Sequence, residues 1–125
     1  MGAIHDHIRS ANLEMVLEVI KNNAEAVNSK DQKGFPAIVL ATYHGKLEIT
    51  KALINNGAII DAKDSMGNTA LMGVVFKGNE DIVKMLLKAG ANPNATNTTG
   101  ATPLSYANQF GHKNIADLLI QNGAK

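Results

Sequence analysis

The chain has 125 residues, of which 45% are hydrophobic and 18% are charged, a balance that suits one folded domain with its own core. Twelve basic and eleven acidic side chains leave a formal net charge of +1, which provides no electrostatic attraction for nucleic acid or an anionic membrane. The absence of cysteine excludes disulfides and cysteine-ligated zinc. We therefore expect no nucleic-acid partner and no membrane contact.

The first segment, residues 1–30, predicts two short helices joined by a turn. Ala11 and Asn23 lie at the two positions where later segments carry glycine. Alanine in a left-handed conformation costs about 1 kcal/mol, whereas asparagine tolerates that conformation better. We interpret this segment as an irregular terminal unit. The apolar stripe of its second helix is predicted from Leu13, Met15, Val19 and Ile20.

The start of this segment, His5-Asp6-His7, is the one candidate for metal ligation. Residues i and i+2 of a helix do not face each other, and no second pair of ligands supports such a site. We interpret the three residues as an exposed polar turn. We therefore expect no metal, no cofactor and no catalytic residues, and a small metal-dependent enzyme using these side chains is the alternative from another functional class.

Three further segments, about residues 31–63, 64–96 and 97–125, repeat one pattern with a period of 33 and no gaps. Seven columns stay in phase, which chance does not produce. They contain Gly34, Gly67 and Gly100; Ile38, Leu71 and Leu104; Gly45, Gly78 and Gly111; Ile49, Ile82 and Ile115; Leu53, Leu86 and Leu119; Gly57, Gly90 and Gly123; and Asp31, Asp64 and Asn97.

Each segment predicts a turn, a short helix, a tight glycine turn and a second helix. Thr69 and Thr102 are good N-caps, and Pro103 suits the first position of a helix. Glycine takes the positive φ that commonly follows a helix end. Helices this short are marginal alone, but stacked units bury one another's apolar faces. We therefore predict a single all-α domain over residues 1–125, an α-solenoid of four stacked helix-turn-helix repeats with protruding hairpin loops.

The repeated unit resembles the ankyrin repeat. The stretch "GATPLSYANQFGHKNIADLLIQNGA" from Gly100 is especially similar to the family pattern, and the similarity covers about residues 4 to 124. The family's characteristic histidine is replaced by Val39, Met72 and Ser105, which removes the usual donor for hydrogen bonds between neighbouring loops. The resemblance implies that loop tips and first-helix ends line a concave surface that binds partners.

Aromatic residues gather at the positions that the resemblance assigns to this surface. Tyr43, Phe76 and Phe110 recur near the end of the first helix of successive units, and Phe35 lies on a turn tip. Aromatic side chains are favoured anchors at interfaces, although packing between adjacent units is the alternative interpretation. The candidate partner-binding residues are Gln32, Lys33, Phe35, Tyr43, His44, Ser65, Met66, Phe76, Lys77, Thr98, Thr99, Gln109 and Phe110.

The sequence thus predicts a monomeric, non-catalytic module that binds a protein partner through a rigid concave face. Alternatives are a spacer or scaffold module within a larger chain and a self-associating structural protein. The N-terminus lacks the basic start and apolar middle of a signal peptide. We therefore expect a cytoplasmic protein, with a secreted or periplasmic mature chain as the alternative.

Overall fold

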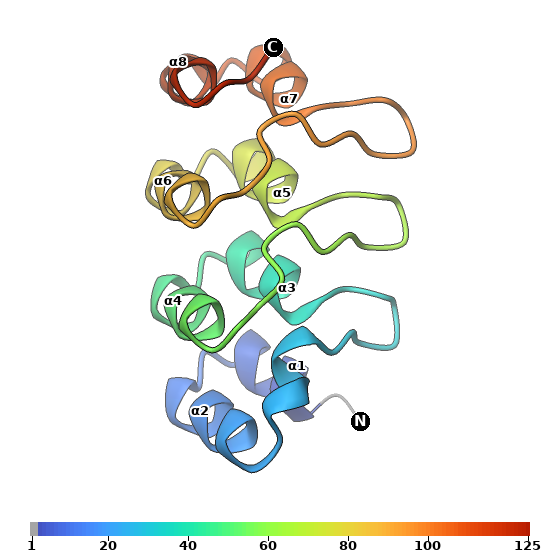
Figure 1. Ribbon diagram of the computed structural model, residues 1–125, viewed down its shortest axis with the longest axis vertical. Helices are drawn as coiled ribbons and strands as arrows, with labels where there is room; N and C mark the ends of the chain where they lie inside the picture. Colours follow the sequence, from blue (N-terminus) through green and yellow to red (C-terminus); the bar gives the residue numbers. More distant parts are fainter. Residues whose placement is uncertain (1–2) are drawn as a thin grey trace.

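The computed structural model describes residues 3–125, and within them every regular element is helical. The only extended pairing in this range is an isolated antiparallel bridge between Lys30 and Pro36. The helices, drawn in Figure 1, are α1 (Ala3–Arg9), α2 (Leu13–Asn22), the 3₁₀-helix η1 (Ala24–Asn28), α3 (Ala37–Tyr43), α4 (Leu47–Asn55), α5 (Ala70–Lys77), α6 (Glu80–Lys88), α7 (Pro103–Gln109) and α8 (Lys113–Gln121).

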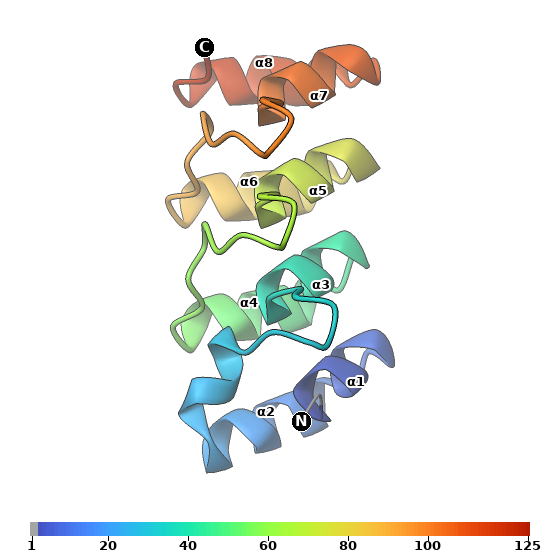
Figure 2. The same ribbon diagram turned by 90° about the vertical axis from the view of Figure 1, so that its right-hand side faces the viewer.

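The α-helices form four antiparallel pairs stacked in chain order, which confirms the predicted all-α solenoid (Figures 1 and 2). One layer contains α1, α3, α5 and α7, and the other contains α2, α4, α6 and α8. Long loops project from the first layer, and we call them the hairpins. Within residues 3–125 no helix is long and apolar enough to cross a membrane.

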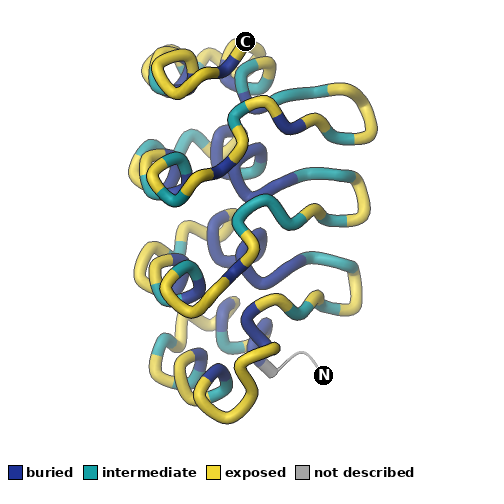
Figure 3. The backbone as a smooth tube through the Cα atoms, in the orientation of Figure 1, coloured by how far each residue is buried: buried dark blue, intermediate teal, exposed yellow. Residues whose placement is uncertain are grey.

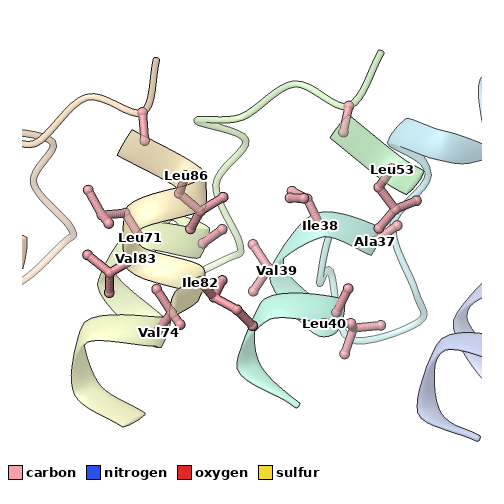
Figure 4. Packing of buried hydrophobic residues seen from close by; sticks show 14 of the residues in the cluster. Ala37, Ile38, Val39, Leu40, Leu53, Leu71, Val74, Ile82, Val83 and Leu86 are labelled. Carbon is pink, nitrogen blue, oxygen red and sulfur yellow. The ribbon is translucent and has the colours of Figure 1, made fainter. Parts of the chain in front are cut away.

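The core runs along the whole stack between the two layers. Ile38 and Leu71 of the first layer and Leu53 and Leu86 of the second are at most 1% exposed, and Figure 4 shows such side chains packed together. Buried stretches concentrate on the inward sides of the helices, while much of the hairpin backbone is exposed (Figure 3). Each pair therefore covers the apolar face of its neighbour, as expected for helices too short to be stable alone.

The predicted helix signals act as expected in the later pairs. The hydroxyl of Thr102 accepts the backbone N–H of Ser105, and the Ser105 hydroxyl accepts the N–H of Thr102, which forms a complete capping box before Pro103. Gly78 ends α5 with φ of 74°. A Cβ atom at this residue would lie 2.8 Å from the His112 ring, so both conformation and space require glycine.

The first pair departs from the prediction in two places. Asn23 is extended, with φ of −150°, rather than left-handed, and its side chain accepts the backbone N–H of Glu25 at the start of η1. The buried residues of α2 are Val16 and Ile20, so placing Met15 rather than Val16 on the central stripe was wrong. Ala11, in contrast, has φ of 59° and occupies the expected glycine conformation.

These departures share one cause, an extra residue near the start of α2. Ala11 precedes Gly45 by 34 residues, whereas Val16 precedes Ile49 by only 33. The insertion therefore falls between Ala11 and Val16. It lengthens α2 to ten residues, against nine in α4, and rotates the stripe by one position.

His5 is buried rather than part of an exposed turn, which corrects the sequence interpretation. It is 1% exposed, and its Nε2 lies 3.1 Å from the carbonyl oxygen of Ser29. The same residue stands 34 positions before Val39, at the family histidine position in the shifted register. Asp6 is exposed and pairs with Arg9. Within residues 3–125 no group of three His, Cys, Asp or Glu residues is arranged to hold a metal ion.

Candidate functional site

A groove of about 600 Å³ opens on the face formed by the first-layer helices and the hairpins, a volume within the range of about 300–1,000 Å³ that is common for ligand pockets. We call it the Gly73 groove because this glycine lies among its central residues. Its walls come from α3, α5, α7 and the second and third hairpins. The lining residues are Phe35, Val39, Leu40, Tyr43, His44, Asp64, Ser65, Met66, Asn68, Thr69, Met72, Gly73, Phe76, Tyr106 and Phe110.

The aromatic residues of the groove are both packed and accessible. Tyr43 is 40% exposed, and Phe76 and Phe110 are each 43% exposed. Phe76 and Phe110 meet edge-on with centroids 4.9 Å apart, and Tyr106 lies 6.2 Å from Phe110. Packing between units and exposure for binding, which the sequence presented as alternatives, therefore coexist in the same side chains.

Gly73 makes room for the groove. The corresponding positions 33 residues earlier and later hold Leu40 and Tyr106, so α5 lacks the large side chain that its neighbours carry there. A Cβ atom at Gly73 would lie 3.6 Å from Cδ1 of Tyr43, an ordinary contact distance. The Tyr43 ring thus borders the vacated space. Beside it, Thr69 and Met72 are fully buried and fix the backbone beneath.

The hairpins are held by side chains at their bases. Asp64 Oδ1 accepts the backbone N–H groups of Met66 and Asn68, each at 2.9 Å. The N–H of Thr98 donates to the carbonyl of Met66 at 3.0 Å. The third and fourth hairpins are therefore linked through backbone as well as through side chains. This rigidity keeps the Phe35–Met66 edge of the groove in place without the family's loop histidine.

Positive charge borders one side of the groove. Lys77 Nζ lies 4.7 Å above the centroid of the Tyr43 ring, in cation–π geometry. Burial, followed by the charges of Lys46, Arg9 and Lys77, lowers the pKa of His44 below its usual value. His44 is therefore neutral at pH 7, and the lysines supply the local charge.

Asp31, at the base of the second hairpin, shows how the same turn is stabilised one unit earlier. Its side chain is 6% exposed and pairs with Arg9. Burial by itself raises the pKa of the Asp31 carboxyl, but the N–H groups of Phe35 and Lys33 and the charges of Arg9 and His5 outweigh it and lower the pKa. The carboxylate is thus ionised in the folded chain over the neutral range.

The structure brings seven of the predicted partner-binding residues into the groove lining and leaves six outside it. Lys77 is outside the lining but contacts Tyr43, and the other five are exposed on hairpins or at the end of α7. Those in the lining are Phe35, Tyr43, His44, Ser65, Met66, Phe76 and Phe110, and those outside are Gln32, Lys33, Lys77, Thr98, Thr99 and Gln109.

Tyr106 is the aromatic residue that sequence reasoning missed. It lies one helical turn before Phe110, so i,i+4 spacing places both on one face of α7, and this spacing was the available signal. The small or buried lining residues gave no such signal, because their contribution depends on the neighbouring unit. These are Val39, Leu40, Asp64, Asn68, Thr69, Met72 and Gly73.

Comparison with known proteins agrees with this architecture. The family model described as "Ankyrin repeats (3 copies)" matches residues 4–97, and the model described as "Ankyrin repeat" matches residues 99–125. A search of curated protein sequences finds no match. Ankyrin repeats are generally protein–protein interaction modules and are typically non-catalytic. Because the two matches together extend over nearly all of the described residues, the chain belongs to the ankyrin-repeat family.

Proposed function

We propose that this chain is a non-catalytic module that binds a protein partner in the Gly73 groove. The observation that carries the proposal is the set of half-exposed rings around an open apolar groove, Tyr43, Phe76 and Phe110, each 40–43% exposed. Aromatic residues in preformed pockets dominate binding energy at interfaces. A groove fixed by capped helices and linked hairpins also loses little conformational entropy on association.

The wider predicted surface has a supporting role in this proposal. Lys33 and Thr98 are exposed on successive hairpins beside the groove, where they form a polar rim around an apolar centre. Such a division into core and rim is typical of protein interfaces. The small net charge and the single lysine above Tyr43 suit a protein rather than a polyanion.

Affinity capture with matched variants tests the proposal. Tyr43→Ala removes a groove wall, whereas Ile59→Ala removes a 60% exposed side chain that does not line the groove. Partners captured by the wild type and by Ile59→Ala but lost by Tyr43→Ala support the groove, provided that circular dichroism shows all three proteins folded. Equal capture by all three proteins would reject it.

The oligomeric state belongs to the same proposal. We propose that the free chain is a monomer, and sedimentation velocity over a hundredfold concentration range tests this. A constant sedimentation coefficient near the value for 13.2 kDa agrees with a monomer that presents the groove to another protein. A concentration-dependent increase that Tyr43→Ala removes would instead identify the groove as a self-association surface.

A further inference from the structure

The same side chain holds the base of three successive hairpins, at Asp31, Asp64 and Asn97. In each, the Oδ1 atom accepts backbone N–H groups two and four residues later. The donors are Lys33 and Phe35 for the first, Met66 and Asn68 for the second, and Thr99 and Ala101 for the third. The three hairpins therefore place the second atom of this side chain, Oδ2 or Nδ2, equivalently.

That second atom is satisfied by the chain itself in two of the three hairpins. Asp31 Oδ2 accepts from the guanidinium of Arg9. Asn97 Nδ2 donates to the hydroxyl oxygen of Tyr106 at 2.9 Å and to Asn68 Oδ1 at 2.8 Å. These contacts join each hairpin to a neighbouring element.

Asp64 Oδ2 makes no hydrogen bond with any residue among 3–125, whereas Oδ1 makes two. The positions that serve Asn97 are Tyr106 and Asn68, and their counterparts 33 residues earlier are Gly73 and Phe35. Neither counterpart has a polar side-chain atom. All three residues line the Gly73 groove, so the unsatisfied carboxylate oxygen borders the space where a tyrosine lies one unit later.

We propose that the Gly73 groove binds a tyrosine side chain of the partner protein, with its hydroxyl donating a hydrogen bond to Asp64 Oδ2. The inference rests on the proposed function and adds the chemistry of the occupant. The incoming ring would lie beside Tyr43 as the missing side chain of α5, in the register of Tyr106. The remaining volume of about 600 Å³ holds the residues that flank the tyrosine.

Charge selects this occupant over others. A carboxylate oxygen needs a donor, which phenylalanine lacks, and it repels aspartate, glutamate and phosphotyrosine. The ammonium of Lys77, 4.7 Å from the Tyr43 ring, disfavours an arginine or lysine in the same space. A neutral donor on an aromatic ring satisfies both conditions, and hydrogen bonds to a charged acceptor are the stronger kind.

The direct test titrates the protein with N-acetyl-tyrosine amide, N-acetyl-phenylalanine amide and the O-phosphorylated tyrosine amide, followed by ¹H–¹⁵N chemical shifts. We expect the tyrosine amide to shift the Gly73 and Asn68 signals and to bind about tenfold more tightly than the phenylalanine amide. The phosphorylated compound should bind more weakly than either. Equal affinity for all three compounds overturns the proposal.

Two variants complete the test. Gly73→Tyr restores the side chain that Tyr106 provides one unit later and should abolish binding, and Gly73→Leu, which copies Leu40, serves if the first variant fails to fold. Asp64→Asn keeps the Oδ1 acceptor while removing the charge, so phosphotyrosine amide should bind it more tightly than it binds the wild type. Unchanged discrimination in Asp64→Asn contradicts a role for this carboxylate.

Failure of this inference differs from failure of the proposed function. If tyrosine and phenylalanine amides bind equally and Gly73→Leu blocks both, the groove still binds apolar side chains and only the role of Asp64 is wrong. If neither compound shifts the groove signals and Gly73→Leu leaves partner capture unchanged, both proposals are wrong.

Discussion

The ring of Phe76 meets the ring of Phe110 edge-on, with planes at 88° and centroids 4.9 Å apart, and this contact joins the end of α5 to the residue after α7. Such aromatic pairs contribute about 0.5–1.5 kcal/mol beyond the area that they bury. In a double-mutant cycle with Phe76→Ala and Phe110→Ala, we therefore expect a coupling of about 1 kcal/mol in the free energy of unfolding, measured by urea denaturation. Additive effects would show that the rings contribute to the groove but not to stability.

Ala11 is the one non-glycine residue with positive φ among residues 3–125. Glycine takes this conformation without the Cβ clash, so we expect Ala11→Gly to raise the free energy of unfolding by about 0.5–1 kcal/mol. Thermal and urea denaturation measure the change. Ala89→Gly is the matched control, because Ala89 has φ of −81° and should lose stability through the flexibility that glycine adds to the unfolded chain.

Thr50 is fully buried, and its hydroxyl oxygen has no hydrogen-bond partner. The residues 33 and 66 positions later are Val83 and Ala116, so the fold accepts an apolar side chain there. We expect Thr50→Val to stabilise the protein by about 1 kcal/mol, since it removes an unsatisfied polar atom and keeps the shape. Thr42→Val should not stabilise, because the Thr42 hydroxyl donates to Ile38 O at 2.9 Å.

Asp31 makes stability depend on pH in the acid range. Its pKa is lower in the folded chain than the ordinary value of 3.8, so below about pH 5 the unfolded chain binds more protons and stability falls as pH decreases. We expect Asp31→Asn to cost about 1 kcal/mol at pH 7 and progressively less toward pH 3. Urea titrations at several pH values measure this, with exposed Asp117→Asn as control. A constant difference at all pH values would contradict the assignment.

The period of 33 was sufficient to predict the helix pairs, their stacking and their glycine turns, because each column has a local physical cause that repeats. It did not predict the first pair as well, since an insertion between Ala11 and Val16 breaks the phase within a single turn. The extended Asn23 follows from η1, a short helix with no counterpart in the later units.

The groove was predicted less completely than the fold. Half-exposed Tyr43 and Phe76 could be found because they share one column. Tyr106 and Gly73 also share a column, but they contribute in opposite ways, one by filling space and the other by leaving it open. The carboxylate of Asp64 is likewise ordinary in its own hairpin. Its missing partner becomes visible only when the contacts of Asn97 are compared with it.

The stacking of helix pairs has a consequence for how the protein opens. In each step α1 lies against α3, α3 against α5, and α5 against α7, so the two ends of the chain are free to unfold independently of one another. The groove draws on α3, α5 and α7 at once. A bound partner would therefore act as a clamp across three successive pairs, and amide hydrogen exchange should slow along the whole clamped stretch while α1 and α2 continue to fray.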